Sequence, residues 1–150
     1  MSFPLPYPMR LALELAADAA TAGEVPVGAV IMRGDEVIAT AANAMCGGHD
    51  PTAHAEMEAI RAASATLATH RLDDCDLYVT LEPCAMCAGA ISHARLRRLY
   101  YGADDAKGGA VAHGPRFFSQ PTCHHRPDVY GGIGEAEAGE MLRAFFRNRR

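Results

Sequence analysis

Short segments with strand-like composition alternate along this chain with longer segments of helical periodicity, and this order limits the folds that it can adopt. The strand-like segments are residues 25–32, 37–42, 76–81 and 98–102. A turn at residues 33–36 joins the first two of them into a hairpin. The helical segments are residues 8–22, about 50–67, 84–93 and 135–149. Strands separated by helices predict an α/β layered sheet that begins with an antiparallel hairpin.

The length of 150 residues and the hydrophobic content of 49% are those of one globular domain, which we expect to span residues 1–150. No apolar run reaches the roughly 18 residues of a membrane helix, so we expect no membrane partner. The first ten residues contain three prolines, which is not the pattern of a secretory signal. These features predict a cytoplasmic location.

Cys84 and Cys87 stand three residues apart at the beginning of a helical segment, directly after Pro83. Residues at i and i+3 share one helical face, so both thiolates can bind the same metal ion. The N–H groups and the dipole at a helix N-terminus also favour the thiolate form. Alone, a Cys-x-x-Cys pair is weak evidence, because a redox pair or half of a structural zinc site has the same spacing.

A histidine and a carboxylate at the start of another helix favour a catalytic metal site. His54 and Glu56 precede the two cysteines by about thirty residues, and we expect Asp50 or Thr52 to cap their helix. The chain has no second Cys-x-x-Cys motif to complete a four-ligand structural site. One histidine and two cysteines leave the fourth position of a zinc ion for water, which is the catalytic arrangement.

Glu56 is the candidate for moving protons at such a site. Zinc lowers the pKa of its water towards about 7, which provides hydroxide at neutral pH. Glu56 is two residues from the histidine ligand, and we expect both to lie in the first turn of the helix. The order H-x-E…P-C-x-x-C is the pattern of zinc nucleobase deaminases, in which hydroxide attacks a ring carbon and ammonia leaves.

The other cysteines and histidines give no second site. Five cysteines cannot all pair, so we expect no disulfide framework, and Cys46, Cys75 and Cys123 have no predicted role. Residues 113–126 are rich in His and Cys, but their spacing fits no standard zinc pattern. We expect this segment to form a loop.

The formal net charge of −4 is distributed unevenly along the chain. Residues 1–94 carry 4 arginines and 12 acidic residues, giving −8, whereas residues 95–150 carry 10 basic and 6 acidic residues, giving +4. Residues 143–150 contain four arginines and no acidic residue. Such asymmetry suggests a polyanionic partner for the C-terminal part, although a solvated helix face would have the same composition.

Several longer motifs make the sequence resemble the bacterial tRNA-specific adenosine deaminases, which convert the wobble adenosine of an anticodon to inosine. Three of the motifs are specific to that branch: DPTAHAE at 50–56, DAK at 105–107 and FFR at 145–147. Further matching stretches are residues 24–30, 43, 77–84, 86–91 and 101–103. The resemblance implies a cytidine-deaminase-like fold with three α/β/α layers, one Zn²⁺ per chain, and a homodimer that binds the tRNA anticodon loop.

The resemblance also implies substrate contacts outside the metal site. Asn43 would hydrogen-bond the flipped base or its ribose, and Asp105 would contact the ribose. The remaining candidates for substrate binding are Ala55, Phe145, Arg147, Arg149 and Arg150. Without the resemblance, Asn43 would be interpreted as a turn residue and Phe145 as part of the core.

Two other functions are compatible with parts of the sequence. A zinc deaminase of a free base or nucleoside, such as guanine or cytidine, would use the same scaffold. It would have no evident use for the clustered arginines at 147–150. A zinc-stabilised RNA-binding module without catalysis would not need the unliganded carboxylate of Glu56.

Overall fold

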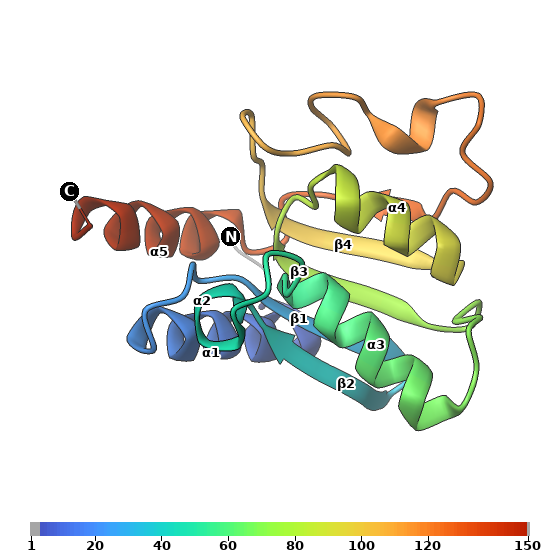
Figure 1. The fold of residues 1–150 in the computed structure, drawn as a ribbon, viewed down its shortest axis with the longest axis horizontal. Helices are drawn as coiled ribbons and strands as arrows, with labels where there is room; N and C mark the ends of the chain where they lie inside the picture. The colour runs from blue at the N-terminus through green and yellow to red at the C-terminus, as the bar shows by residue number, and fades with distance from the viewer. Residues whose placement is uncertain (1–3, 150) are drawn as a thin grey trace.

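A five-stranded mixed sheet forms the centre of the protein in a computed structural model, which describes residues 4–149 (Figure 1). Its strands are β1 (Gly28–Arg33), β2 (Glu36–Ala42), β3 (Asp76–Leu81), β4 (Arg98–Ala103) and β5 (Asp128–Tyr130). They are arranged in the order β2-β1-β3-β4-β5. Strand β1 is antiparallel to both β2 and β3, whereas β3, β4 and β5 are parallel. The predicted antiparallel hairpin is therefore confirmed.

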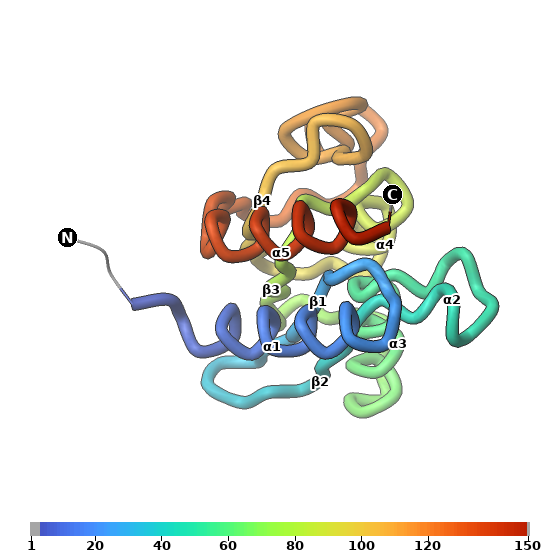
Figure 2. Tube along the Cα trace, turned by 90° about the vertical axis from the view of Figure 1, so that its left-hand side faces the viewer, coloured from blue at the N-terminus to red at the C-terminus, as the bar shows by residue number. Residues whose placement is uncertain are grey.

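Helices cover both faces of the sheet, which confirms the predicted three-layer α/β/α architecture. They are α1 (Tyr7–Thr21), α2 (Met45–Gly48), α3 (Ala55–Leu67), α4 (Ala85–Ala94) and α5 (Glu135–Arg147). Helices α3 and α4 cover one face, and α1 and α5 cover the other (Figures 1 and 2). Alternate residues of β1 supply the two cores: Ala29 and Ile31 pack towards α3 and α4, whereas Val30 and Met32 pack towards α1.

The described helices are all short. Helix α1 has 15 residues, and across residues 4–149 no helix combines the length and the apolar character needed to cross a membrane.

The second long helix begins later than its sequence suggests. Asp50 does not cap it, because its Oδ1 accepts hydrogen bonds from the N–H and the hydroxyl of Thr52 at 2.8 and 2.7 Å. These bonds close a local turn, and the chain then enters α3 at Ala55 with His54 as the N-cap residue. The predicted cap is therefore wrong, and the side chain of His54 makes no capping hydrogen bond.

The long segment between β4 and β5 forms a loop, as its composition predicts. Its regular structure is one turn of 3₁₀ helix, η1 (Phe117–Ser119). Its polar side chains bind the protein itself: the Arg126 guanidinium donates to the carbonyls of Phe118 and Gln120, and the His125 ring bonds the Leu96 carbonyl. Among the described residues, Cys123 and its neighbouring histidines do not form a metal-binding group.

Candidate active site

The side chains of His54, Cys84 and Cys87 meet beyond the carboxyl end of β3. The Nδ1 atom of His54 lies 3.6 Å from the Sγ of Cys84 and 3.5 Å from the Sγ of Cys87. His54 and Cys84 are the N-cap residues of α3 and α4, and Cys87 lies in the first turn of α4. The fold thus brings the N-termini of two helices together, and the three side chains can hold a metal ion.

The two thiols of this cluster differ in their readiness to ionise. A hydrogen bond from the Cys87 side chain lowers the pKa of Cys84 to about 5, against the opposing effect of burial. The backbone N–H groups of Met86 and Cys87 lower it further. The same thiol–thiolate hydrogen bond, together with burial, raises the pKa of Cys87. One thiolate therefore exists at neutral pH, which is the form that binds metals.

Glu56 is buried beside this cluster. Glu56 is 4% exposed and lies in the first turn of α3. Burial raises the pKa of Glu56 to about 7, opposed by a backbone hydrogen bond, and the nearby Cys84 thiolate raises it further. The side chain can therefore both accept and release a proton near neutral pH.

A cavity of about 260 Å³ opens onto these groups. It is lined by Val25, Val27, Asn43, Met45, His54, Glu56, Leu81, Glu82, Cys84, Asp105 and Gly108. This volume is below the roughly 300–1,000 Å³ of typical small-molecule pockets, so the cavity suits a small group. Its mixed lining of apolar side chains and a few polar groups is typical of ligand sites.

Asn43 connects β2 to the first turn of α3. Its residue is 8% exposed, and its Oδ1 accepts a hydrogen bond from the N–H of Ala55 at 2.8 Å. Ala55 is fully buried and is not among the residues that line the cavity. Of these two predicted substrate contacts, the structure therefore places Asn43 at the cavity and Ala55 behind it.

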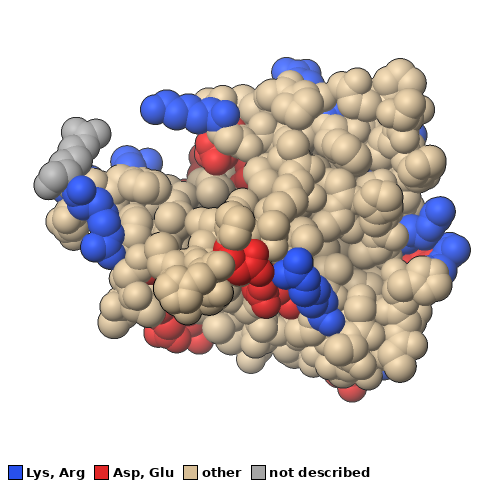
Figure 3. All heavy atoms as spheres, viewed as in Figure 1, with Lys and Arg blue, Asp and Glu red and all other residues tan. Residues whose placement is uncertain are grey.

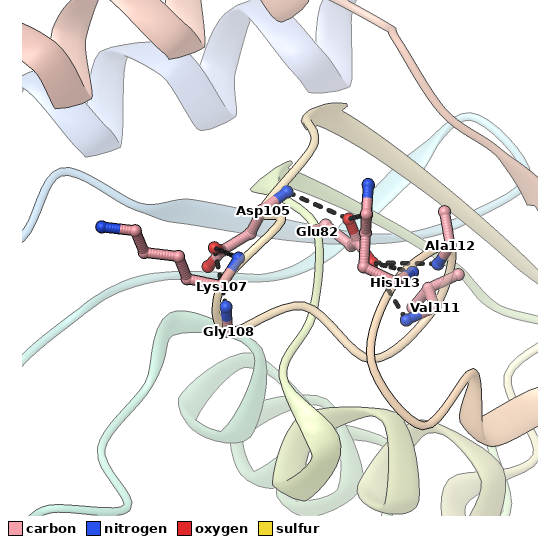
Figure 4. A network of polar contacts seen from close by, with 7 residues as sticks. All are labelled: Glu82, Asp105, Lys107, Gly108, Val111, Ala112 and His113. Carbon is pink, nitrogen blue, oxygen red and sulfur yellow. Dashed lines mark hydrogen bonds and ion pairs between the residues drawn. The ribbon is translucent and has the colours of Figure 1, made fainter.

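Asp105 reaches the cavity from the loop that follows β4 (Figure 4). Its Oδ1 accepts hydrogen bonds from the N–H groups of Lys107 and Gly108 at 3.2 and 2.9 Å. Its own N–H donates to Glu82 Oε1 at 3.0 Å. Asp105 is thus held on both its backbone and its side chain, and it lines the cavity together with Asn43.

Comparison with known proteins places this geometry in a family. The profile of the MafB19-like deaminases matches residues 7–150. A tRNA-specific adenosine deaminase from Agrobacterium fabrum is 58% identical over 142 residues, which cover 95% of this chain and 93% of the relative. The chain belongs to the tRNA-specific adenosine deaminase family.

Comparison with solved structures supports the same family assignment for this deaminase. A structure from a study of A-to-I editing by tRNA:A34 deaminases at the wobble position has a TM-score of 0.89 and 57% identity, covering 91% of this chain and 99% of that chain. A guanine deaminase from Bacillus subtilis has a TM-score of 0.65 and 34% identity, covering 94% and 92%. The deaminase is therefore closer to the tRNA-editing structure than to this free-base enzyme.

The arginines at the end of α5 in this deaminase contact other side chains of the same helix. Arg147 forms an ion pair with Glu140 at 3.0 Å, and Arg143 contacts the same carboxylate at 3.4 Å. The guanidinium of Arg149 lies 4.3 Å from the ring centre of Phe145. On the face shown in Figure 3, the basic side chains are scattered and do not gather into one patch.

The two aromatic residues of the FFR motif differ in exposure. Phe145 is partly buried against α1 and beneath Arg149, whereas Phe146 is 51% exposed. Phe146 is therefore better placed than the predicted Phe145 to stack on a base. Arg150, the last predicted contact, lies outside the described residues.

Two buried glutamates at the cavity edge had no predicted role. Glu24 accepts hydrogen bonds from the N–H groups of Cys46 and Gly47 at 3.1 and 2.8 Å, and so holds α2, whose Met45 lines the cavity. Glu82 is 2% exposed and binds the loop after β4. In the sequence, each of them is an acidic residue next to an apolar strand. Such a residue is buried with the strand, and its carboxylate then needs hydrogen-bond donors from elsewhere in the fold.

Proposed function

We propose that this chain hydrolyses adenosine to inosine at the wobble position of tRNA, releasing ammonia. The observation that carries the proposal is the His54, Cys84 and Cys87 cluster beside the buried carboxyl of Glu56, at a small cavity. The similar tRNA-specific adenosine deaminases support the same substrate. The match of the MafB19-like deaminase profile over residues 7–150 also supports a single deaminase domain.

The donor set fits one zinc ion per chain. Tetrahedral bonds of about 2.3 Å to sulfur and about 2.0 Å to nitrogen separate the two ligand atoms by about 3.5 Å. The Nδ1 of His54 lies 3.6 and 3.5 Å from the two sulfur atoms. Zinc is a common partner of mixed thiolate and imidazole ligands, and when bound with an open fourth position it supplies a water activated at neutral pH.

Glu56 would transfer the protons of the reaction. Its carboxylate would take the two protons of the attacking water in turn, delivering one to N1 of the ring and the other to the amino group that leaves carbon 6 of adenine. The products are inosine and ammonia, so the carboxylate returns to its starting state after one turnover. Its burial keeps bulk water away from this transfer.

The cavity walls would orient the nucleoside. The N–H of Ala55 donates to Asn43 Oδ1 and so orients the side chain, and the amide nitrogen of Asn43 would donate to the base or ribose. Asp105, on another wall, would accept a hydrogen bond from a ribose hydroxyl. Ala55 would contribute indirectly, because its N–H fixes the Asn43 side chain.

The anticodon loop would lie across the C-terminal end of α5. Bases in a single-stranded loop are the least costly to extrude into a recessed site, and aromatic and Arg side chains can stack on them. Arg147, Arg149 and Arg150 would contact phosphates, and Phe145 together with the exposed Phe146 would supply the aromatic surface. We further propose a homodimer, by likeness to the family, and a cytoplasmic location, where tRNA is available.

The decisive experiment measures ammonia release from four substrates by the zinc-loaded chain. The substrates are an anticodon stem-loop with adenosine at the wobble position, free adenosine, guanine and cytidine. We expect release from the stem-loop alone, and a stem-loop with guanosine at that position is the matched control. Faster release from guanine or cytidine would instead identify a free-base or nucleoside deaminase.

A further inference from the structure

Glu82 is a buried carboxylate that the proposed chemistry does not use. It follows β3 directly and stands two residues before Cys84, and its side chain is fully buried. A carboxylate in such a place requires hydrogen-bond donors, because burial without them is costly. Within residues 4–149, all the hydrogen-bond donors to Glu82 come from one loop, residues 105–113.

Five N–H groups converge on the two oxygens of Glu82 (Figure 4). Oε1 accepts from the N–H of Asp105 at 3.0 Å and lies 2.7 Å from the Nδ1 of His113. Oε2 accepts from the N–H groups of Val111, Ala112 and His113 at 3.1, 2.9 and 3.1 Å. Because an ionised carboxylate only accepts hydrogen bonds, the 2.7 Å contact makes Nδ1 of His113 the donor to Oε1.

The loop is also fitted closely around this carboxylate. A Cβ atom on Gly109 would lie 2.5 Å from Glu82 Oε2, so glycine permits the approach. The N–H of Ala110 donates to the carbonyl of Pro83 at 2.9 Å, which joins the loop to the residue before Cys84. Residues 82 and 83 therefore connect the loop to the segment that carries the metal-binding cysteines.

A second metal site does not explain this cluster. Ligand atoms of Glu82, Asp104 and His113 lie within 4.8 Å of one another. Both oxygens of Glu82 are already occupied by N–H donors, and Nδ1 of His113 must carry a proton to serve as one of them. A protonated Nδ1 cannot bind a metal, so the Nδ1 of His113 and the two oxygens of Glu82 serve as a hydrogen-bonded anchor.

We propose that Glu82 and His113 are positioning residues for substrate binding, which together fix the loop 105–113 as one wall of the cavity. This inference rests on the proposed function. The anchored Asp105 and Gly108 line the cavity, and Asp105 also closes the turn that contains Gly108. The anchor therefore sets where the wall meets the ribose, without touching the reacting atoms.

The first test replaces His113 in the zinc-loaded enzyme and measures kcat and KM on the anticodon stem-loop. His113→Ala removes one donor, and we expect KM to rise about five- to tenfold with kcat nearly unchanged, because the wall binds a part of the substrate that does not react. His113→Asn places an amide N–H near the same position and should restore KM. His124→Ala is the matched control, because His124 is exposed and makes no side-chain hydrogen bond within residues 4–149.

Two kinetic results would overturn the inference. An unchanged KM in His113→Ala would mean that the anchor does not position the wall. A lower kcat together with zinc loss would mean that the anchor only stabilises the fold. Failure of the wild-type chain to act on the stem-loop would be distinct from both, because it would refute the proposed function itself.

A second measurement tests the anchor without any substrate. Glu82→Gln replaces one acceptor oxygen by an NH₂ group that faces N–H donors. We expect faster hydrogen exchange at the amides of residues 105–113, with the exchange of α1 unchanged as an internal control for folding. Unchanged exchange in the loop would overturn the inference whatever the kinetics show.

Discussion

The cavity and the end of α5 hold their polar groups in opposite ways. Around the cavity, Asn43, Glu56 and Glu82 are all less than a tenth exposed. The side chains of Asn43 and Glu82 also accept hydrogen bonds from backbone N–H groups. On α5, Arg147 and Glu140 are exposed and pair with each other. The cavity geometry is therefore fixed by the fold, whereas the charge that α5 presents to a partner depends on ion pairs that solvent and salt can weaken.

The largest effect should come from removing a ligand on the fixed side of this comparison. Cys84→Ser replaces a thiolate by a hydroxyl, which is a much weaker zinc ligand, so we expect loss of bound zinc and of deamination. Cys46→Ser is the control, because Cys46 is an exposed cysteine outside the cluster. Metal analysis of both proteins measures the effect. Full zinc content in Cys84→Ser would show that the cluster is not the metal site.

A nearly equal effect on rate should follow from Glu56→Gln, but without loss of the metal. The amide cannot accept and return a proton, so we expect kcat to fall by about 10²- to 10⁴-fold while zinc content and folding are retained. Glu58→Gln is the matched control on the same helix, where the carboxylate is partly exposed and pairs with Arg61 at 3.2 Å. Loss of zinc in Glu56→Gln would instead make Glu56 a ligand.

The metal cluster could be predicted from sequence because its chemistry depends on short spacings. Cys84 and Cys87 share a helical turn, and the fold had to bring His54 to them if they bind one ion. The start of α3 was mispredicted for an equally local reason. The Asp50 side chain accepts hydrogen bonds from Thr52 in a turn before the helix, so it is not available to cap the helix.

The anchors of the cavity walls could not be predicted, because their partners are distant in sequence. The donors to Glu82 are 23 to 31 residues away, and those to Glu24 are 22 and 23 residues away. Hydrophobic periodicity indicates which face of an element is buried, but it does not indicate which loop supplies N–H groups to a buried carboxylate. The short helix α2 was missed for the same reason, since Glu24 holds it from outside.

The ion pairs of Glu140 on α5 could be predicted from residue spacing, but not from a count of charges. Glu140 precedes Arg143 by three residues and Arg147 by seven, so all three lie on one side of the helix. The excess of +4 in residues 95–150 therefore overstates the charge that is free to meet a phosphate. The exposed end of α5 is where a small change should alter RNA binding without altering the cavity.

The smallest effect should come from Glu140→Gln, which removes the carboxylate shared by Arg143 and Arg147. With both guanidinium groups released, we expect binding of the anticodon stem-loop to tighten a few-fold at low salt. Each new phosphate contact should steepen the slope of log K against log salt by about 0.7. Glu137→Gln removes the same charge from the same helix, but Glu137 forms no ion pair in the described part of the chain.

Comparison of these two variants separates local pairing from net charge. If both tighten binding equally, the overall charge of α5 matters and the ion pairs do not. If Glu140→Gln alone has the effect, Arg147→Ala should cancel it in the double variant, because the released guanidinium is then absent. In either case kcat at saturating stem-loop should stay unchanged, since the cavity is fixed by groups that α5 does not hold; a change in kcat would mean that the two regions are coupled.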